Sequence, residues 1–256
     1  MSAPDERTFG GARPLRGTVR VPGDKSISHR ALVFAALAAG RSRLANVATG
    51  ADVAATRRAL GLLGVPVADD GPGALAVEGR GAEGLREPDD VVDCANSGTT
   101  MRVLAGVVAS RPFLTVLTGD ASLRRRPMAR VVRPLRAMGA HIDGRSGGEH
   151  APLVVRGGAL RGMRHELAVA SAQVKAALVL AGLAADGVTE VVTPAPTRDH
   201  TERMLAALGA PVLAGGDGRV VRVERGAPQP FELAVPGDPS SAAFFVVAAT
   251  IVRARS

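Results

Sequence analysis

Long apolar runs recur along the chain and define its pattern of predicted elements. One run covers residues 31–39, a second residues 103–109 and a third residues 177–185. Small polar residues that cap helix N-termini precede each run, so each predicts a helix that is apolar on all sides and therefore buried. The first of these helices is expected to start within residues 21–30, VPGDKSISHR, and to end at Gly40.

Between the buried helices, the pattern predicts short β-branched strands and more polar helices. Strands are expected at residues 43–47, 114–118 and 189–193, and polar helices at residues 52–63 and 201–208. A glycine follows the last apolar residue of each polar helix, at spacings of 75 and 70 residues: Gly64, Gly139 and Gly209. The chain therefore consists of βα-type units of about 70 residues.

A tripeptide marks both ends of this repeated region. Pro22-Gly23-Asp24 recurs as Pro236-Gly237-Asp238, and an apolar run follows each copy. Three units fit between the two copies, and a fourth has only begun at residue 256. Because an apolar helix without partner strands cannot bury its face, we expect a fragment of a longer protein, poorly supported after Phe231.

Composition narrows the class of protein. The chain has 256 residues, 46% of them hydrophobic, and a formal net charge of +8, which raises nucleic-acid binding as an alternative. Against it, the basic residues are scattered, and with no Trp or Tyr and only 6 Phe there are few side chains for bases to stack on. One cysteine, the absence of an apolar leader at residues 1–10, and apolar runs too short for a membrane span predict a soluble cytoplasmic protein.

Lysine is rare in this chain. Among 32 basic residues only Lys25 and Lys175 are lysines, and all the others are arginines. A compact ammonium can approach a reacting oxygen closely, so Lys25, beside Ser26 and Arg30 at a helix start, is the first candidate for a chemical role. Lys175 is a weaker candidate, because a lysine in a first helical turn is usually solvated. On this segment alone, a capped surface helix explains the residues as well.

Two further helix starts are suited to an anion. Asn96 and the following serine are capping residues, and Gly98 would let a ligand approach the backbone. In the third unit, Ser171 would cap, and Gln173 would present an amide in the first turn. Ordinary capping explains each segment about equally well.

An arginine-rich segment precedes the polar helix of the second unit. Pro127 fits the first helical turn, which leaves Arg126 at the mouth of that helix, and Pro134 should kink or shorten it. Cys94 is interpreted as a small buried residue without a base partner. The five histidines show no ligand spacing, so we expect no metal site.

Taken together, six segments resemble the 5-enolpyruvylshikimate-3-phosphate (EPSP) synthase family, also called 3-phosphoshikimate 1-carboxyvinyltransferase. In order, they are VPGDKSISHRA, NSGTTMR, LTGDASLRRRPM, SAQVKAALVLAG, TRDHTERM and VPGDPSSAAFF. The resemblance covers nearly all of residues 13–252. It implies the enolpyruvyl transferase fold, an inside-out α/β barrel with two domains of three βαβαββ units. Here one complete domain, residues 23–235, would be joined to a fragment of the other, residues 1–22 and 236–256.

By resemblance, the reaction transfers the enolpyruvyl group of phosphoenolpyruvate to the 5-hydroxyl of shikimate 3-phosphate and releases phosphate. This is a step of the shikimate pathway, toward chorismate and the aromatic amino acids. The substrates are anionic small molecules, and no cofactor, metal, nucleic acid or membrane is implied. The resemblance assigns roles in substrate binding, with Lys25 also catalytic, to nine residues: Lys25, Ser26, Arg30, Asn96, Gly98, Arg126, Ser171, Gln173 and Arg198.

The chain departs from the family pattern in two ways. Ala95 and Ala172 replace a usual glycine and an occasional serine. Family members also continue for about two and a half more units, which carry the acidic groups for proton transfer. We therefore expect weak shikimate 3-phosphate binding at best, no turnover by this chain alone, and a possible role for a complementing C-terminal half.

Three alternatives remain open at this stage. UDP-N-acetylglucosamine enolpyruvyl transferase shares the fold, but it has a Lys-Asn pair where this chain has Lys25-Ser26, and it uses a loop cysteine. The others are a nucleic-acid-binding module and a non-catalytic remnant.

Overall fold

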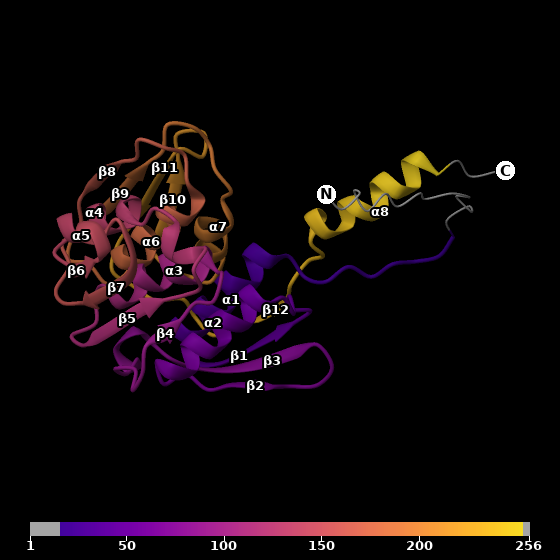
Figure 1. Ribbon diagram of the computed structural model, residues 1–256, viewed down its shortest axis with the longest axis horizontal. Helices are drawn as coiled ribbons and strands as arrows, with labels where there is room; N and C mark the ends of the chain where they lie inside the picture. Colours follow the sequence, from indigo (N-terminus) through magenta and orange to yellow (C-terminus); the bar gives the residue numbers. More distant parts are fainter. Residues whose placement is uncertain (1–15, 253–256) are drawn as a thin grey trace, which may run out of the picture.

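The computed structural model describes residues 16–252, which form three units of similar build (Figure 1). The first unit contains α1 (Lys25–Leu37), β1 (Ala39–Ala45), α2 (Ala51–Leu62), β2 (Val67–Asp69), β3 (Ala74–Arg80), the 3₁₀ turn η1 (Ala82–Gly84) and β4 (Val92–Asp93). The second contains α3 (Gly98–Val108), β5 (Leu114–Thr118), η2 (Leu123–Arg125), α4 (Ala129–Ala137), β6 (His141–Gly144), α5 (Arg145–Gly148), β7 (His150–Arg156) and β8 (Arg164–Glu166). The third contains α6 (Ala172–Gly182), β9 (Thr189–Val192), α7 (His200–Ala207), β10 (Val212–Gly215), β11 (Val220–Val223) and β12 (Glu232–Ala234), and α8 (Pro239–Ile251) follows it.

Each four-stranded sheet combines strands from two units. The strand orders are β4-β5-β7-β6, β8-β9-β11-β10 and β12-β1-β3-β2. In every sheet, the last strand of one unit runs parallel to the first strand of the next, and the other pairings are antiparallel. The third unit returns to the first through β12 and β1, so the three units close into a ring.

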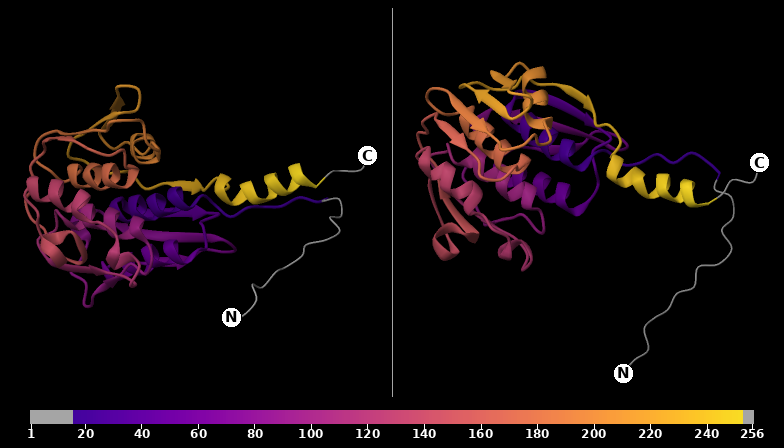
Figure 2. Two further views of the ribbon diagram at one scale, coloured as in Figure 1. Left: turned by 45° about the horizontal axis from the view of Figure 1, so that its top comes forward. Right: turned by 90° about the horizontal axis from the view of Figure 1, so that it is seen from above.

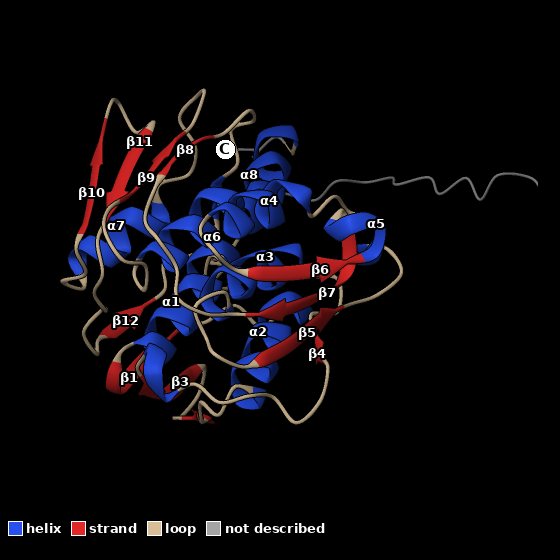
Figure 3. Ribbon diagram, turned by 90° about the vertical axis from the view of Figure 1, so that its left-hand side faces the viewer, coloured by secondary structure: helices blue, strands red, loops and turns tan. Residues whose placement is uncertain are grey.

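The first helices of the three units form the centre of this ring, with the sheets around them (Figure 3). In α1, every residue from Ser28 to Leu37 is buried, and most of α3 and α6 is buried too. A helix that is apolar on all sides needs neighbours on all sides, which explains this central position. The approach of α3 to α6 is close, because a Cβ at Gly106 would lie 2.2 Å from the Ala177 carbonyl oxygen.

The predicted elements are present, with small shifts at their ends. Helix α1 ends at Leu37 and not at Gly40, because Ala38 is extended and β1 already pairs with β3 from Ala39 onward. Strand β1 therefore covers residues 39–45 instead of 43–47. The second helices start and end within one residue of the predicted bounds, and Gly64, at φ +82°, follows α2 in a left-handed conformation.

The expected position of Pro127 in the first turn of α4 was wrong. Pro127 precedes the helix, which begins at Ala129, and Arg126 ends the short η2 turn. Pro134 lies inside the helix and does not end it, since α4 continues to Ala137. A proline loses only one backbone hydrogen bond, and the buried neighbours Val131 and Leu135 hold the helix against the core.

The two Pro-Gly-Asp segments lie side by side. The Asp24 N–H donates to the Pro236 carbonyl at 2.7 Å, and the Asp238 N–H donates to the Pro22 carbonyl at 2.9 Å. Glycine is required at position 23, because a Cβ on Gly23 would lie 1.9 Å from the Asn46 carbonyl oxygen.

The segment after Phe231 divides into two parts. The expected lack of support is wrong for β12, which pairs with β1 in the register Leu44 to Leu233. Helix α8 fits the expectation, because it extends from the body of the molecule and no side chain in it is fully buried (Figure 2). Within residues 16–252, no helix combines the length and apolar character needed to cross a membrane.

Candidate functional site

The first cluster of polar side chains forms where α1 begins. Asp24 caps the helix by accepting from the Ile27 N–H at 2.8 Å. The Ser26 hydroxyl accepts from Arg198 Nη1 at 3.2 Å, although the two residues lie 172 positions apart. Arg30 Nη1 donates to the Ser26 carbonyl at 2.9 Å. One helix start and the segment before α7 thus bring two guanidinium groups to one serine.

Arg30 is held rigidly at this place. It is 3% exposed, and its Nε donates to the Thr201 hydroxyl at 2.7 Å. Burial lowers the pKa of Arg30 to about 10, and the charge of Glu202 opposes that shift. The guanidinium therefore stays charged at neutral pH, and its orientation is fixed in advance for an anion.

Lys25 lies at the exposed edge of the same helix start. Its Nζ forms an ion pair with Asp52 at the beginning of α2, and its side chain is 54% exposed. A cavity of about 460 Å³ lies beside it, lined also by Asp238 and Ser241 at the start of α8. The ammonium group is thus accessible to a ligand entering from this side.

The second cluster forms where α3 begins. Asn96 accepts from Arg126 Nη2 through Oδ1 and donates to Asp120 Oδ2 at 2.7 Å. The hydrogen bond from Asn96, followed by one from the Leu123 N–H, lowers the pKa of Asp120, which is therefore ionised at neutral pH. A Cβ on Gly98 would lie 2.7 Å from Arg102 Nη1 and 3.3 Å from Arg126 Nη1. Glycine leaves the room that these two guanidinium groups occupy.

Arg102 is a member of this cluster that the sequence analysis did not single out. Its Nη1 donates to Gln173 Oε1 at 2.7 Å, and its Nη2 donates to the Pro127 carbonyl at 3.1 Å. Burial, followed by the charges of Arg126 and Arg130, lowers its pKa. The one available signal was its position four residues after Gly98, which is one turn further along the same helix.

Gln173 joins the third unit to the second. Its Nε2 donates to the Thr99 hydroxyl at 2.8 Å, while its Oε1 accepts from Arg102. Ser171 caps α6 through a 3.4 Å bond from the Val174 N–H. Within residues 16–252, the Ser171 hydroxyl makes this one hydrogen bond. Ser171 is therefore close to Gln173 in sequence but is not hydrogen-bonded to the second cluster.

Buried hydroxyl groups connect the two clusters. His29 Nδ1 lies 2.7 Å from the Thr56 hydroxyl, which lies 2.7 Å from the Thr100 hydroxyl. Thr100 also bonds Ser97 Oγ at 2.7 Å and the Asp52 carbonyl at 3.3 Å. The starts of α1, α2 and α3 are therefore fixed relative to one another.

Lys175 differs from the expectation of a solvated lysine. Its side chain is 0% exposed, and its Nζ is paired with Glu202 on α7, whose side chain is 1% exposed. The position of Lys175 in the first turn of α6 did not reveal its burial. Helix α6 is buried on all sides, and the partner of Lys175, Glu202, lies on another helix. Cys94 is buried as predicted, and burial raises its thiol pKa to about 12.

The arrangement is suited to binding anions that carry several oxygens. Lys25, Arg30 and Arg198 surround one helix start, and Arg102 and Arg126 lie at another. Helix N-termini add the partial positive charge of their free N–H groups. Preorganised cations of this kind stabilise phosphate and carboxylate groups without needing to rearrange.

Comparisons with known proteins agree with this geometry. The sequence model of the family described as EPSP synthase (3-phosphoshikimate 1-carboxyvinyltransferase) matches residues 10–255. A 3-phosphoshikimate 1-carboxyvinyltransferase of Thermus thermophilus is 58% identical over 240 residues, 93% of this chain and 55% of that protein. The protein of the same name from Chloroflexus aurantiacus is 52% identical over 246 residues, 95% of this chain and 57% of its own length.

A solved structure shows the same fold. The EPSP synthase from Acinetobacter baumannii superposes with a TM-score of 0.88 at 43% identity, covering 95% of this chain and 55% of that one. The expected enolpyruvyl transferase fold is thereby confirmed, and the chain spans about half the length of the curated relatives it matches. On its motifs, its ring of three units and these matches, the chain belongs to the EPSP synthase family.

Proposed function

We propose that this chain provides the shikimate 3-phosphate side, and part of the phosphoenolpyruvate side, of an enzyme that transfers an enolpyruvyl group between them. The observation that carries the proposal is the convergence of Arg30 and Arg198 on Ser26, from the first and third units, which the closure of the ring makes neighbours. Two guanidinium groups and one hydroxyl at a helix start offer a charged, directional set of donors for a phosphate or carboxylate.

In this proposal, the second cluster binds phosphoenolpyruvate. Arg126 and Arg102 supply the charge, and Gly98 leaves the space beside their guanidinium groups. Gln173 is bonded to Arg102 and Thr99 at the start of α3. We assign it a place between the two substrates, where it can exchange those bonds for contacts to either one. Ser171, at the start of the same helix, is assigned to shikimate 3-phosphate, and Lys25 contacts both substrates.

The cations would act mainly by binding and stabilising the negative charges of the substrates. Attack of the 5-hydroxyl on the enol carbon of phosphoenolpyruvate needs a proton donor to the methylene carbon and an acceptor for the hydroxyl proton. Within residues 16–252, the carboxylates beside the clusters are already engaged: Asp52 is paired with Lys25, and Asp120 is ionised and bonded to Asn96. We therefore propose that these residues bind and orient substrates, and that proton transfer needs groups outside the described part of the chain.

The same assignment includes a division of the chain. We propose that residues 23–235 are a complete three-unit domain, and that residues 1–22 and 236–256 belong to a second one. The closure of the ring by β12 and β1 supports this, as does the placement of the two Pro-Gly-Asp segments against each other.

The test is calorimetric titration of shikimate 3-phosphate into the purified chain and into Lys25→Ala and Arg198→Gln variants. Both side chains are exposed, so the variants should fold. Because a hydrogen bond to a charged group contributes roughly 1.5–3 kcal/mol, we expect each variant to bind at least about tenfold more weakly. Arg58→Gln is the matched control, since Arg58 is an exposed arginine on α2.

Two results would contradict the proposal. One is equal affinity of the wild type and the two site variants, and the other is preference for UDP-N-acetylglucosamine over shikimate 3-phosphate. Phosphate release by the chain alone, with both substrates present, would show that proton transfer does not need further groups. A complementing segment can be tested by adding the remaining part of the Thermus thermophilus relative and measuring the same release.

A further inference from the structure

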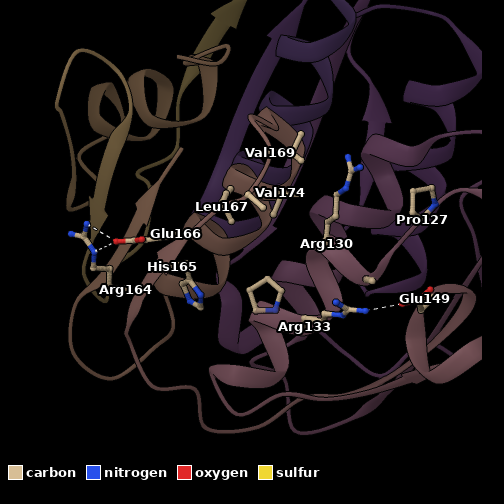
Figure 4. A pocket seen from close by; sticks show the side chains of 13 residues that line it. Pro127, Arg130, Arg133, Glu149, Arg164, His165, Glu166, Leu167, Val169 and Val174 are labelled. Carbon is tan, nitrogen blue, oxygen red and sulfur yellow. Dashed lines mark hydrogen bonds and ion pairs between the residues drawn. The ribbon is translucent and has the colours of Figure 1, made fainter. Parts of the chain in front are cut away.

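A separate groove lies between α4 and the segment that connects β8 to α6 (Figure 4). Its volume is about 560 Å³, within the range of roughly 300–1,000 Å³ that is common for small-molecule sites. It opens beside the second cluster, since the lining residues Pro127 and Val174 directly follow Arg126 and Gln173 in sequence. None of the nine residues assigned to the substrates lines it.

The groove has one uncompensated positive charge. Arg133 donates to Glu149 at 2.7 Å, and Arg164 is paired with Glu166 and Glu190, so these guanidinium groups are neutralised. Within residues 16–252, Arg130 has no ion-pair partner and no side-chain hydrogen bond, and it is exposed. A ligand that complements this groove therefore carries a single negative charge.

The wall opposite Arg130 is apolar. Leu167, Val169 and Val174 lie together across the groove, and the guanidinium of Arg130 extends toward Val169 (Figure 4). Val169 is 46% exposed and so offers apolar surface to the groove, whereas Val174 is 3% exposed and forms part of the core. Covering this wall with a nonpolar group would remove apolar surface from water.

A buried histidine lies at the end of the groove (Figure 4). His165 is 7% exposed, and within the described residues its Nε2 has no hydrogen-bond partner. Burial lowers the pKa of His165, so the imidazole is neutral at neutral pH and adds no charge. Because Nε2 is itself inaccessible to solvent, His165 does not contact a ligand through this atom, and its ring serves as a local reporter of the groove.

We propose that this groove binds small monocarboxylates with an apolar body, the carboxylate on Arg130 and the body against Leu167, Val169 and Val174. One free guanidinium and a nonpolar wall favour such a molecule over a phosphate dianion, which needs more cations and no apolar surface. The volume favours a small molecule over a protein segment. This proposal does not depend on the proposed function, because its residues are different ones.

The experiment uses 4-phenylbutyrate as the probe, with the imidazole NMR signals of His165 as the local reporter. The probe is titrated into the wild-type chain and into Arg130→Gln and Val169→Ser variants. The amide 4-phenylbutyramide tests the charge, and butyrate tests the apolar body. Arg58→Gln is again the matched control, and chemical unfolding confirms that every variant is folded.

We expect saturable shifts of the His165 signals with a dissociation constant on the order of 1 mM, as befits a ligand of this size. Arg130→Gln and the amide should each weaken binding about tenfold, Val169→Ser and butyrate should weaken it several-fold, and Arg58→Gln should leave it unchanged. Absence of saturation, or equal binding of the amide and the carboxylate, would overturn the proposal. Equal weakening by Arg58→Gln and Arg130→Gln would also overturn it, because the effect would then be one of net charge. Shikimate 3-phosphate binding is measured separately, so failure of one proposal leaves the other open to its own test.

Discussion

The two lysines of this chain occupy opposite environments. Lys25 is half exposed at a helix start, as its neighbours in sequence predicted, whereas Lys175 is fully buried against Glu202. Their rarity marked both as unusual, but local sequence wrongly indicated that Lys175 is solvated, because a buried charge is tolerated only when a partner from elsewhere in the chain reaches it. Arg102 was overlooked for the same reason, since Gln173 and Pro127 give it its position.

His29 should make stability depend on pH. Burial lowers its pKa from 6.5 to about 4, so between these values the unfolded chain binds a proton more readily than the folded chain. The free energy of unfolding should therefore fall as the pH drops from 6.5 toward 4, by up to about 3 kcal/mol from this group. Urea unfolding at pH 7.5, 6 and 5 measures it. A His29→Asn variant should have a shallower pH dependence, and identical slopes would exclude His29 as a cause.

At the scale of elements, apolar pattern and capping residues predicted the first and second helices of the units and three of the twelve strands that the structure describes. The errors lie at ends that tertiary contacts decide, such as the end of α1, where pairing of β1 with β3 begins at Ala39. Caps behaved as expected, with Asp24, Ser97 and Ser171 each accepting a hydrogen bond from the first turn of its helix.

The ion pair between α6 and α7 should dominate the stability of their contact. Lys175→Met leaves Glu202 buried without a partner, so we expect the free energy of unfolding to fall by about 3–5 kcal/mol. The double variant Lys175→Met/Glu202→Leu should recover most of that loss, because neither charge then remains. Denaturant unfolding measures both. For comparison, Arg203→Met removes an exposed pair with Asp199 and should change stability by less than about 1 kcal/mol. A double variant as unstable as the single one would show that the pair, and not an isolated charge, matters.

At the scale of the whole molecule, the repeat predicted three similar units, and the structure shows how they close. The pairing of β12 with β1 completes the ring, and α8 lies outside it. Repeated motifs indicate how many units there are. They do not say which strand of the last unit meets the first, because that pairing joins residues about 190 positions apart.

Helix α8 should contribute little to the stability of the ring. Phe244 is 80% exposed and Val246 is 60% exposed, and burial of apolar surface is the main stabilising term in folding. Removing residues 239–256 should therefore change the free energy of unfolding by less than about 1 kcal/mol and raise the solubility of the chain. Chemical unfolding and light scattering would measure the two effects. A loss of several kcal/mol would mean that α8 packs against the ring in solution.

The sequence by itself determined the local features of this protein: buried helices from apolar runs, helix starts from capping residues, the ends of the second helices from glycines, and the family from six motifs in order. These features depend on neighbours within a few residues, so the pattern carries them. Tertiary structure alone decided which helix starts face one another, as with Ser26 and Arg198, and which charges are buried, as with Lys175 and Glu202. Such contacts depend on how distant segments pack, and no local pattern records that packing.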